Sequence, residues 1–338
     1  MIIKYNKHIL LYMLSCLIFF GMIVIFEIIF GIIIVEYPFS NPDVCLEHPV
    51  LGLDLKNNYV ENHCLTKIDF SKIKKIYTIS NGIRFTAGNS NENQNFVALF
   101  GCSMAFGWGC NDDETFVSRL CEYLPNYNGY NFAVPSASTQ HMYYKLKTNK
   151  VKSVVSEDTG VGIFMAFGFQ PERLHLSVKS PWVNQFPDYI YDRETDDLIY
   201  NGSIGALHPK QELMYSFLRK SNILRYFKPY IPPYTNTLIK KYVDQIYVSK
   251  KYFLEQFPGS RFIVLIAPPD YTFPKIKLLK KLLEERKIEY MVPRKEEYFD
   301  VILSIDRNET MYPDAHFTPL TQDMLAKEFC QYLTKQKL

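Results

Sequence analysis

The longest hydrophobic run of the chain lies near its N-terminus. Between Ile9 and Val35 the only strongly polar side chain is Glu27, and most other positions are Ile, Leu, Phe or Val. About 20 apolar residues span a bilayer as a helix, so this run predicts a transmembrane segment. A cleavable signal peptide has a shorter apolar core and a small-residue cleavage site, and neither feature occurs here. A buried core helix is the alternative interpretation.

The charges on either side of this run predict its orientation. Lys4 and Lys7 precede it, and acidic residues follow it at Glu36, Asp43, Glu47 and Asp54. Lysines favour the cytoplasmic side, so we expect a cytoplasmic N-terminus and a periplasmic or otherwise extracytoplasmic remainder. Glu27 is unfavourable at mid-bilayer and is expected near the outer interface. Residues 1–36 are therefore predicted to be a cytoplasmic tip and a transmembrane signal-anchor, which contacts the membrane through residues 9–35.

From residue 95 onward, short apolar runs alternate with amphipathic stretches. The runs of strand length are 96–100, 130–134, 161–167, 261–267 and 289–292. The helical stretches are 115–124, 139–154, 274–287 and 319–333. Strands that are apolar throughout are covered by helices on both faces. Residues 95–338 are therefore predicted to form a three-layer α/β domain with a mostly parallel sheet.

Two regions depart from this alternation. Residues 170–257 contain a predicted hairpin, with strands 189–191 and 198–200, followed by two helices at 212–227 and 236–257. Ligands of open α/β sheets bind at the carboxyl ends of the strands, so this insertion is predicted to be a lid. Residues 37–94 have two short apolar runs and are predicted to be a juxtamembrane segment that packs on the main domain.

Composition excludes some kinds of partner. A net charge of +3 with scattered lysines does not indicate nucleic-acid binding. The 25 Tyr and 25 Phe suit sugars among other ligands. The seven cysteines form no C-x-x-C or Cys/His cluster, so neither a metal site nor a cofactor is predicted. Cys45 and Cys64 either pair in an oxidising compartment or remain free thiols, and the sequence leaves both open.

Candidate chemistry lies at the two ends of the predicted domain. Ser103 follows a buried strand just where a helix is about to begin, which exposes it at the sheet edge next to backbone N–H groups. A serine needs a base to take its proton, and His316, with Asp314 to orient it, is the strong candidate. Taken singly, the G-x-S motif also fits an ordinary turn and the D-x-H motif an ordinary helix cap.

The residues around Ser103 carry a specific resemblance. The block Gly101-Cys-Ser-Met-Ala-Phe-Gly-Trp-Gly-Cys-Asn-Asp-Asp-Glu-Thr-Phe116 is similar to the first block of the SGNH/GDSL hydrolase superfamily. It most resembles the membrane-anchored bacterial branch, which reads G-C-S or G-D-S, then F-x-F-G-x-G, then N-D-D-E-T-F. The resemblance implies a flavodoxin-like α/β/α fold, with ester or acyl chemistry at the carboxyl edge of the sheet.

The resemblance assigns roles residue by residue. Ser103 matches the nucleophile, and Asp314 and His316 match the last block of the family. Ala133 stands where a glycine usually offers its N–H to the oxyanion, beside the N–H of Ser103 itself. Gln170 stands where an Asn donor is usual, and Arg173 is the other candidate for that role and for contact with substrate. Trp108 is a candidate wall of the acyl pocket, and Cys102, in the place of the motif's Asp, is expected to pack.

Three functions remain open at this point. An esterase (O-deacylase) that acts on an O-acylated cell-envelope glycan outside the cytoplasm is the main prediction. An O-acyltransferase would use the same triad, and a decayed glycan-binding protein is allowed by the departures at Ala133 and Gln170. An α/β-hydrolase fits less well, because Ala105 replaces the second glycine of its motif and Asp314 lies only two residues before His316.

Overall fold

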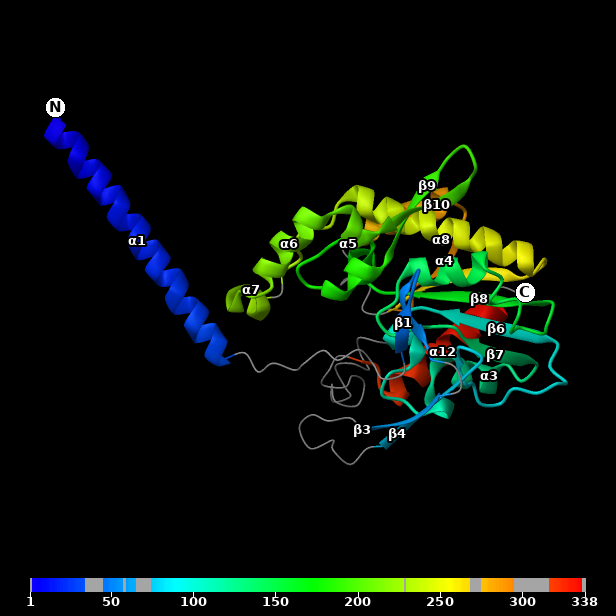
Figure 1. Ribbon diagram of the computed structural model, residues 1–338. Helices are drawn as coiled ribbons and strands as arrows, with labels where there is room; N and C mark the ends of the chain where they lie inside the picture. Colours follow the sequence, from blue (N-terminus) through cyan, green and yellow to red (C-terminus); the bar gives the residue numbers. More distant parts are fainter. Residues whose placement is uncertain are drawn as a thin grey trace.

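The computed structural model describes residues 2–33, 45–56, 59–64, 74–227, 229–267, 275–294 and 316–335. Helix α1 (Ile2–Ile33) stands away from the main body of the protein, which is built around one large sheet (Figure 1). Among the described residues, one helical stretch is long and apolar enough to cross a membrane, Leu11–Ile33 of α1.

The main sheet has eight strands in the described part of the chain. Their spatial order is β12 (Glu289–Met291), β11 (Arg261–Ile266), β8 (Thr159–Ala166), β6 (Asn95–Phe100), β7 (Tyr127–Asn131), β5 (Ile83–Arg84), β4 (Lys74–Ser80) and β3 (Tyr59–Cys64). The first five strands run parallel, and the last three are joined antiparallel. The predicted parallel sheet is therefore confirmed, with an antiparallel extension on one side.

Helices cover both faces of this sheet. Successive strand residues point to opposite faces, so Val97 and Leu99 of β6 join one core cluster while Phe96 and Ala98 join the other. The first cluster is completed by α3 (Phe116–Tyr123) and α12 (Pro319–Lys335). The second is completed by α4 (Thr139–Lys147), α8 (Asn236–Gln256) and α9 (Ile276–Glu285). In Figure 1, α4 and α8 lie above the sheet and α3 and α12 below it, which confirms the three-layer α/β prediction.

Two predicted boundaries were wrong. The strand expected at 130–134 is β7 (Tyr127–Asn131), whose polar sequence hides it from a search for apolar runs. Asn128 is buried in this strand, where its amide accepts from the Ser90 N–H and donates to Glu157. The helix expected to reach residue 154 is α4, which ends at Lys147. Asn149 adopts a left-handed φ of 57° and stops the helix there.

The segment before residue 95 is part of the domain. Strands β3, β4 and β5 extend the main sheet, and β1 (Cys45–His48) pairs with β2 (Gly52–Leu55) as a separate hairpin. Asp54 of this hairpin is buried and accepts from Lys145 of α4 at 2.6 Å. Burial alone would raise the pKa of Asp54, but the charge and hydrogen bond of Lys145 outweigh it, so the pKa lies below its usual range. The side chain of Cys64 lies outside the described residues, so its pairing with Cys45 stays a prediction.

The predicted insertion is shorter than expected. The hairpin is present as β9 (Pro187–Asp192) and β10 (Asp197–Ser203), followed by α5 (Ile204–Leu207). The helix predicted at 212–227 is two helices, α6 (Pro209–Leu218) and α7 (Asn222–Phe227). The prediction that α8 belongs to the lid was wrong. Ile239, Val243 and Ile246 of α8 are buried against the sheet, because this helix is the crossover between β8 and β11.

His141 of α4 lies in the interior of the domain. The sequence alone would favour a surface position for this histidine, but it is fully buried, with Phe186 and the charged residues Asp54, Lys145 and Arg173 around it. Its ring packs edge-to-face on Phe186 at 4.8 Å, and its Nδ1 faces the Ser138 N–H. Burial is the main cause that lowers the pKa of His141 to about 3. The side chain is therefore neutral in the folded protein at every pH above that value.

This buried histidine should destabilise the fold in acid. The unfolded chain binds a proton at His141 below pH ~6.5, whereas the folded chain does not until pH ~3, so folding becomes less favourable as pH falls through that window. We expect His141→Gln to reduce the pH dependence of the unfolding free energy by up to ~1.4 kcal/mol per pH unit between pH 6 and 4. Urea unfolding of parent and variant across this range measures the difference. Equal slopes would show that His141 is protonated in the fold.

Candidate active site

Ser103 is held at the carboxyl edge of the sheet by a tight strand-to-helix turn. Strand β6 ends at Phe100, and the short helix α2 (Ser103–Phe106) begins three residues later. Gly101 between them has a φ of 156°, and a Cβ at this position would lie 2.6 Å from the Ala105 Cβ. Only glycine fits so close an approach. The turn leaves Ser103 half-buried at the rim of the core.

His316 is brought to Ser103 from the far end of the chain. Its Nε2 lies 2.8 Å from the Ser103 Oγ, although the two residues are 213 positions apart. This is the distance expected between a nucleophile and its general base. His316 lies just before α12, so the helix fixes where the imidazole enters the site. Asp314 lies outside the described residues, and its role in orienting His316 stays a prediction.

A buried arginine holds the loop that follows Ser103. The Arg84 side chain is fully buried, and its guanidinium donates to the carbonyl oxygens of Phe106 and Gly107 at 2.7 Å each and of Cys110 at 2.6 Å. Its Nε donates to Asp112 Oδ1 at 3.1 Å. The guanidinium carbon also lies 4.7 Å from the ring centres of both Tyr77 and Phe106.

Local geometry explains why an arginine is needed there. The last carbonyl groups of a helix have no intrahelical partner. Those of Phe106 and Gly107, at the end of α2, are buried and need donors from elsewhere in the protein. The planar guanidinium presents several donors in a fixed fork, so one side chain can satisfy three carbonyl groups and a carboxylate. Sequence analysis missed Arg84, because a single arginine in a two-residue strand gives no motif or periodic signal.

A second positioning residue links the base to the nucleophile. Gln322 of α12 is fully buried; its Nε2 donates to the Met104 carbonyl at 3.0 Å, and its Oε1 accepts from the Phe116 N–H at 3.1 Å. Met104 directly follows Ser103, and Gln322 is on the helix that follows His316. This amide therefore ties the two halves of the Ser103–His316 pair together.

The backbone donor predicted at Ala133 is already engaged. The Ala133 N–H donates to the Asn131 Oδ1 at 3.1 Å, and Ala133 is fully buried. The Asn131 amide nitrogen in turn faces the carbonyl groups of Ala105 and Phe106, each at 3.3 Å. Asn131 therefore occupies the Ala133 N–H in this arrangement, and the role of Ala133 as an oxyanion donor stays a prediction. The Ser103 N–H precedes the first intrahelical bond of this turn, from the Phe106 N–H to the Cys102 carbonyl, and its role as an oxyanion donor stays a prediction.

Gln170 and Arg173 also serve the fold. Gln170 begins the short 3-10 helix η2 (Gln170–Leu174) and is fully buried. Its Oε1 accepts from the Phe167 N–H at 3.0 Å and from the Tyr242 hydroxyl at 2.8 Å, and its Nε2 donates to the Met165 carbonyl at 3.3 Å. The Arg173 guanidinium donates to the Ala137 carbonyl at 2.6 Å and stacks on Phe169. Both side chains are thus engaged within the fold, and the role of either as a donor to the oxyanion or to substrate stays a prediction.

Replacement of Gln170 should therefore affect stability before it affects chemistry. We expect Gln170→Ala to lower the unfolding free energy by ~1–3 kcal/mol, because the Phe167 N–H and the Tyr242 hydroxyl would each lose the buried acceptor that Gln170 supplies. Gln185→Ala, at an exposed position, is the control and should leave stability unchanged. Thermal unfolding and kcat at a temperature well below the midpoint separate the two effects. A 10²–10³-fold loss of kcat in a stable variant would instead place Gln170 in the oxyanion hole.

Two further predicted residues lie beside Ser103. Cys102 is fully buried in the core cluster that contains Val97 and Leu99, as a packing role requires. Trp108 is half-buried, with its ring centre 5.5 Å from that of Tyr77 and 6.2 Å from that of His316. Its indole therefore lies beside the His316 imidazole, and its role as a wall of the acyl pocket stays a prediction. Among the described residues no group of His, Cys, Asp and Glu could hold a metal ion.

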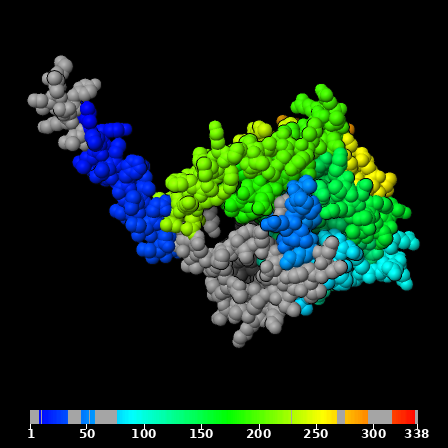
Figure 2. Space-filling view, viewed as in Figure 1, coloured from blue at the N-terminus to red at the C-terminus, as the bar shows by residue number. Residues whose placement is uncertain are grey.

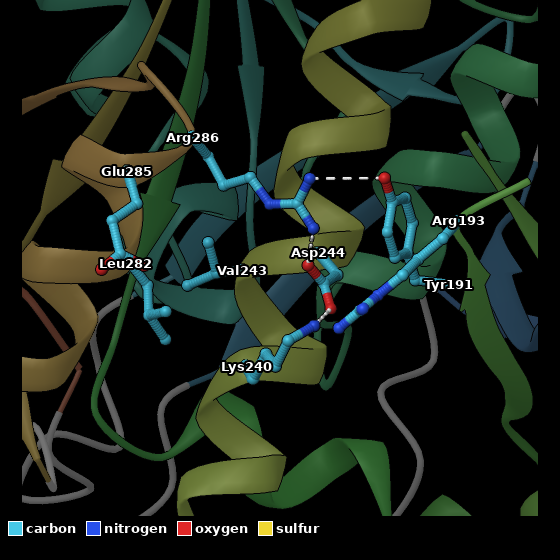
Figure 3. Close-up of a pocket in the computed structure, with 8 residues that line it drawn as sticks. All are labelled: Tyr191, Arg193, Lys240, Val243, Asp244, Leu282, Glu285 and Arg286. Carbon is cyan, nitrogen blue, oxygen red and sulfur yellow. Dashed lines mark hydrogen bonds and ion pairs between the residues drawn. The ribbon is translucent and has the colours of Figure 1, made fainter.

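A separate surface pocket of about 400 Å³ lies between β9, α8 and α9 (Figure 3). Asp244 accepts from Lys240 at 2.6 Å and from Arg286 at 2.5 Å, and the Arg286 guanidinium lies over the Tyr191 ring. These contacts pin the hairpin to the two helices. Neither Ser103 nor His316 lines this pocket, so it is distinct from the candidate active site.

No protein-family model matches the chain, and no curated protein does. The solved structures it resembles include a lipolytic protein of the G-D-S-L family from Veillonella parvula DSM 2008, at 12% identity and a TM-score of 0.41 over 71% of this chain and 98% of that one.

Two esterases are also among these structures. One is the psychrotrophic esterase EstA from Pseudoalteromonas sp., at 9% identity and a TM-score of 0.39 over 72% of this chain and 98% of that one. The other is a catalytic mutant of an acetylxylan esterase from Geobacillus stearothermophilus, at 10% identity and a TM-score of 0.38 over 71% of this chain and 94% of that one.

Proposed function

We propose that the protein is an SGNH-type serine esterase. The observation that carries this proposal is the 2.8 Å contact between His316 Nε2 and Ser103 Oγ at the carboxyl edge of an α/β sheet. A serine so placed has a base that can take its proton. The resemblance of the Gly101–Phe116 block to the SGNH/GDSL superfamily points to the same chemistry from the sequence.

The reaction follows from this geometry. His316 Nε2 takes the Ser103 hydroxyl proton as Oγ attacks the ester carbonyl carbon, and the Ser103 N–H stabilises the oxyanion that forms. Collapse of this intermediate breaks the bond to the alcohol, which leaves with the proton from His316. Water then attacks the acyl-serine by the same steps in reverse order and releases the acid. Asp314 is proposed to hold the imidazole in the tautomer that accepts the proton.

The proposed substrate is an O-acylated glycan of the cell envelope or a similar ester outside the cytoplasm. Helix α1 supplies a membrane anchor of sufficient length, and the lysines before it favour a cytoplasmic N-terminus. The catalytic domain would then face the periplasm or the equivalent outer compartment. If a sugar hydroxyl replaced water in the second step, the same residues would make the protein an O-acyltransferase.

A decayed glycan-binding protein is the second candidate, and one observation favours it. The donors expected from Ala133 and Gln170 are both used within the fold, so only one of the three proposed oxyanion donors remains. A protein without a working oxyanion hole would bind an acylated glycan and turn it over slowly. The intact pairing of Ser103 with His316 favours the enzyme.

Covalent labelling distinguishes these candidates. The full chain in detergent should react with a fluorophosphonate probe and hydrolyse p-nitrophenyl acetate, and Ser103→Ala should abolish the labelling. Cys102→Ala, which changes a packing residue, should keep most of it. Acetyl transfer to an added oligosaccharide would identify a transferase. Failure of the folded parent to label, together with retained binding of an acetylated oligosaccharide, would overturn the enzyme in favour of the binding protein.

A further inference from the structure

The end of α1 is joined to α7 by a polar contact. The Glu27 carboxylate accepts from the Ser221 hydroxyl at 2.5 Å and from the Asn222 backbone N–H at 2.6 Å, and the Asn222 side chain donates to the Glu27 carbonyl at 3.1 Å. A carboxylate at this position accepts from the N–H groups at the start of α7, and the partial positive charge of a helix N-terminus stabilises it. The one acidic residue of the apolar run is therefore used to dock a helix of the catalytic domain.

Aromatic packing continues this contact toward the end of α1. The Phe30 ring lies 4.5 Å from the ring of Tyr226 and 5.4 Å from that of Phe227. Figures 1 and 2 show the blue end of α1 meeting α7, with α6 leading away sideways instead of continuing along the α1 axis. We refer to residues 209–227, which comprise α6 and α7, as the arm.

The arm exposes large apolar side chains on its outer face. Leu213 and Phe217 of α6 are one helical turn apart and are 73% and 74% exposed. Met214 shares their face, and Phe227 of α7 is 64% exposed. Lys210 and Lys220 lie at the two ends of this stripe and are exposed. The opposite face of α6 carries Tyr215, which is buried in the core of the domain.

The position of the arm follows from the length of α1. The residues from Ile9 to Phe26 rise about 27 Å as a helix, close to the ~30 Å thickness of the hydrocarbon core. Glu27 and the α7 end docked on it would therefore lie at the outer boundary of the bilayer. A helix that leaves this point sideways runs along the membrane surface. With the apolar stripe turned toward the acyl chains, the terminal lysines would reach the phosphates.

We propose that the arm is a second membrane contact, which lies in the boundary between the headgroups and acyl chains next to α1. The proposal rests on α1 crossing the membrane, as the proposed function has it. Soluble surfaces rarely expose a contiguous apolar stripe of this kind, and its continuity with α1 identifies a lipid surface as the partner. Tyr215 on the inner face packs in the same core cluster as Met104, the neighbour of Ser103. The arm is therefore fixed to the domain on its inner face, while its outer face is exposed.

Quenching of introduced tryptophans by brominated lipids tests this proposal in the full chain. Phe217→Trp and Met214→Trp probe the stripe, Phe19→Trp in α1 is the positive control, and the exposed Phe85→Trp on the antiparallel side of the sheet is the negative control. Each variant is placed in phosphatidylcholine nanodiscs, and the emission of the parent's Trp108 and Trp182 is subtracted. We expect the two stripe probes to lose at least half as much emission as Phe19→Trp, and Phe85→Trp to lose almost none.

The controls separate the ways in which the proposal can fail. If Phe19→Trp is quenched but both stripe probes behave like Phe85→Trp, the arm does not touch lipid. The apolar stripe would then belong to a protein partner or to a second copy of the chain. If Phe19→Trp itself is not quenched, α1 does not cross the bilayer, and both the proposed anchor and the arm contact are overturned.

Discussion

Ser103→Ala is expected to lower kcat for p-nitrophenyl acetate by about 10⁴- to 10⁶-fold. Without the Ser103 hydroxyl the protein cannot form the acyl-enzyme, and what remains is the contribution of binding and of any oxyanion donor. His316→Ala should fall to a similar level, because the hydroxyl is a poor nucleophile until its proton is taken. Steady-state hydrolysis by parent and variants in the same detergent measures the effect.

The losses of kcat caused by Ser103→Ala and His316→Ala should not be additive. When two residues act together in one step, removal of either abolishes nearly all of their joint contribution to kcat. The kcat of the double variant should therefore be no lower than that of the slower single variant. Thermal unfolding should be similar for all three, since Ser103 and His316 are half-buried polar residues at the rim of the core. A Ser103→Ala variant within tenfold of the parent would show that the reaction does not use this serine.

The sequence predicted the parts of the fold that depend on repeated apolar residues. Strands β6, β8 and β11 were found because they are apolar on both faces. Ser103 and His316, which the sequence motifs singled out, lie 2.8 Å apart at one edge of the sheet. The antiparallel extension was missed, because β3, β4 and β5 mix polar and apolar residues without a run of either. The predicted range of strand β7 was shifted along the chain for the same reason.

The partners of single polar side chains could not be predicted. Gln170 was predicted to be an oxyanion donor, but in the fold its amide oxygen accepts from the Tyr242 hydroxyl. Helix α8 carries Tyr242, which is 72 positions away in the chain. Asn131 similarly takes the N–H that Ala133 was expected to offer. The choice among such partners depends on neighbours that are distant in the chain, so a motif shows which groups are present and not which of them are used.

Outside the Ser103–His316 pair, Arg84 is the position where we expect a single substitution to lower stability and kcat most. Arg84→Met keeps much of the side-chain volume but removes all four hydrogen bonds of the guanidinium, so three buried carbonyl groups and Asp112 each lose a donor. Breaking a buried ionic network from one side typically costs ~3–5 kcal/mol. We expect this loss in unfolding free energy, together with a fall in kcat of about tenfold or more, because the loop from Phe106 to Cys110 no longer holds α2 in place.

A surface arginine provides the matched control. Arg119 is partly exposed and pairs with Glu122 at 3.0 Å, so Arg119→Met should change stability by less than ~1 kcal/mol and leave kcat unchanged. Arg84→Lys keeps the charge but loses the planar fork, and we expect it to fall between Arg84→Met and the parent. The rate of fluorophosphonate labelling, measured at a temperature where each variant is fully folded, reports the placement of Ser103 separately from stability. If Arg84→Met is destabilised yet labels at the parent's rate, Arg84 supports the fold alone and does not position the nucleophile.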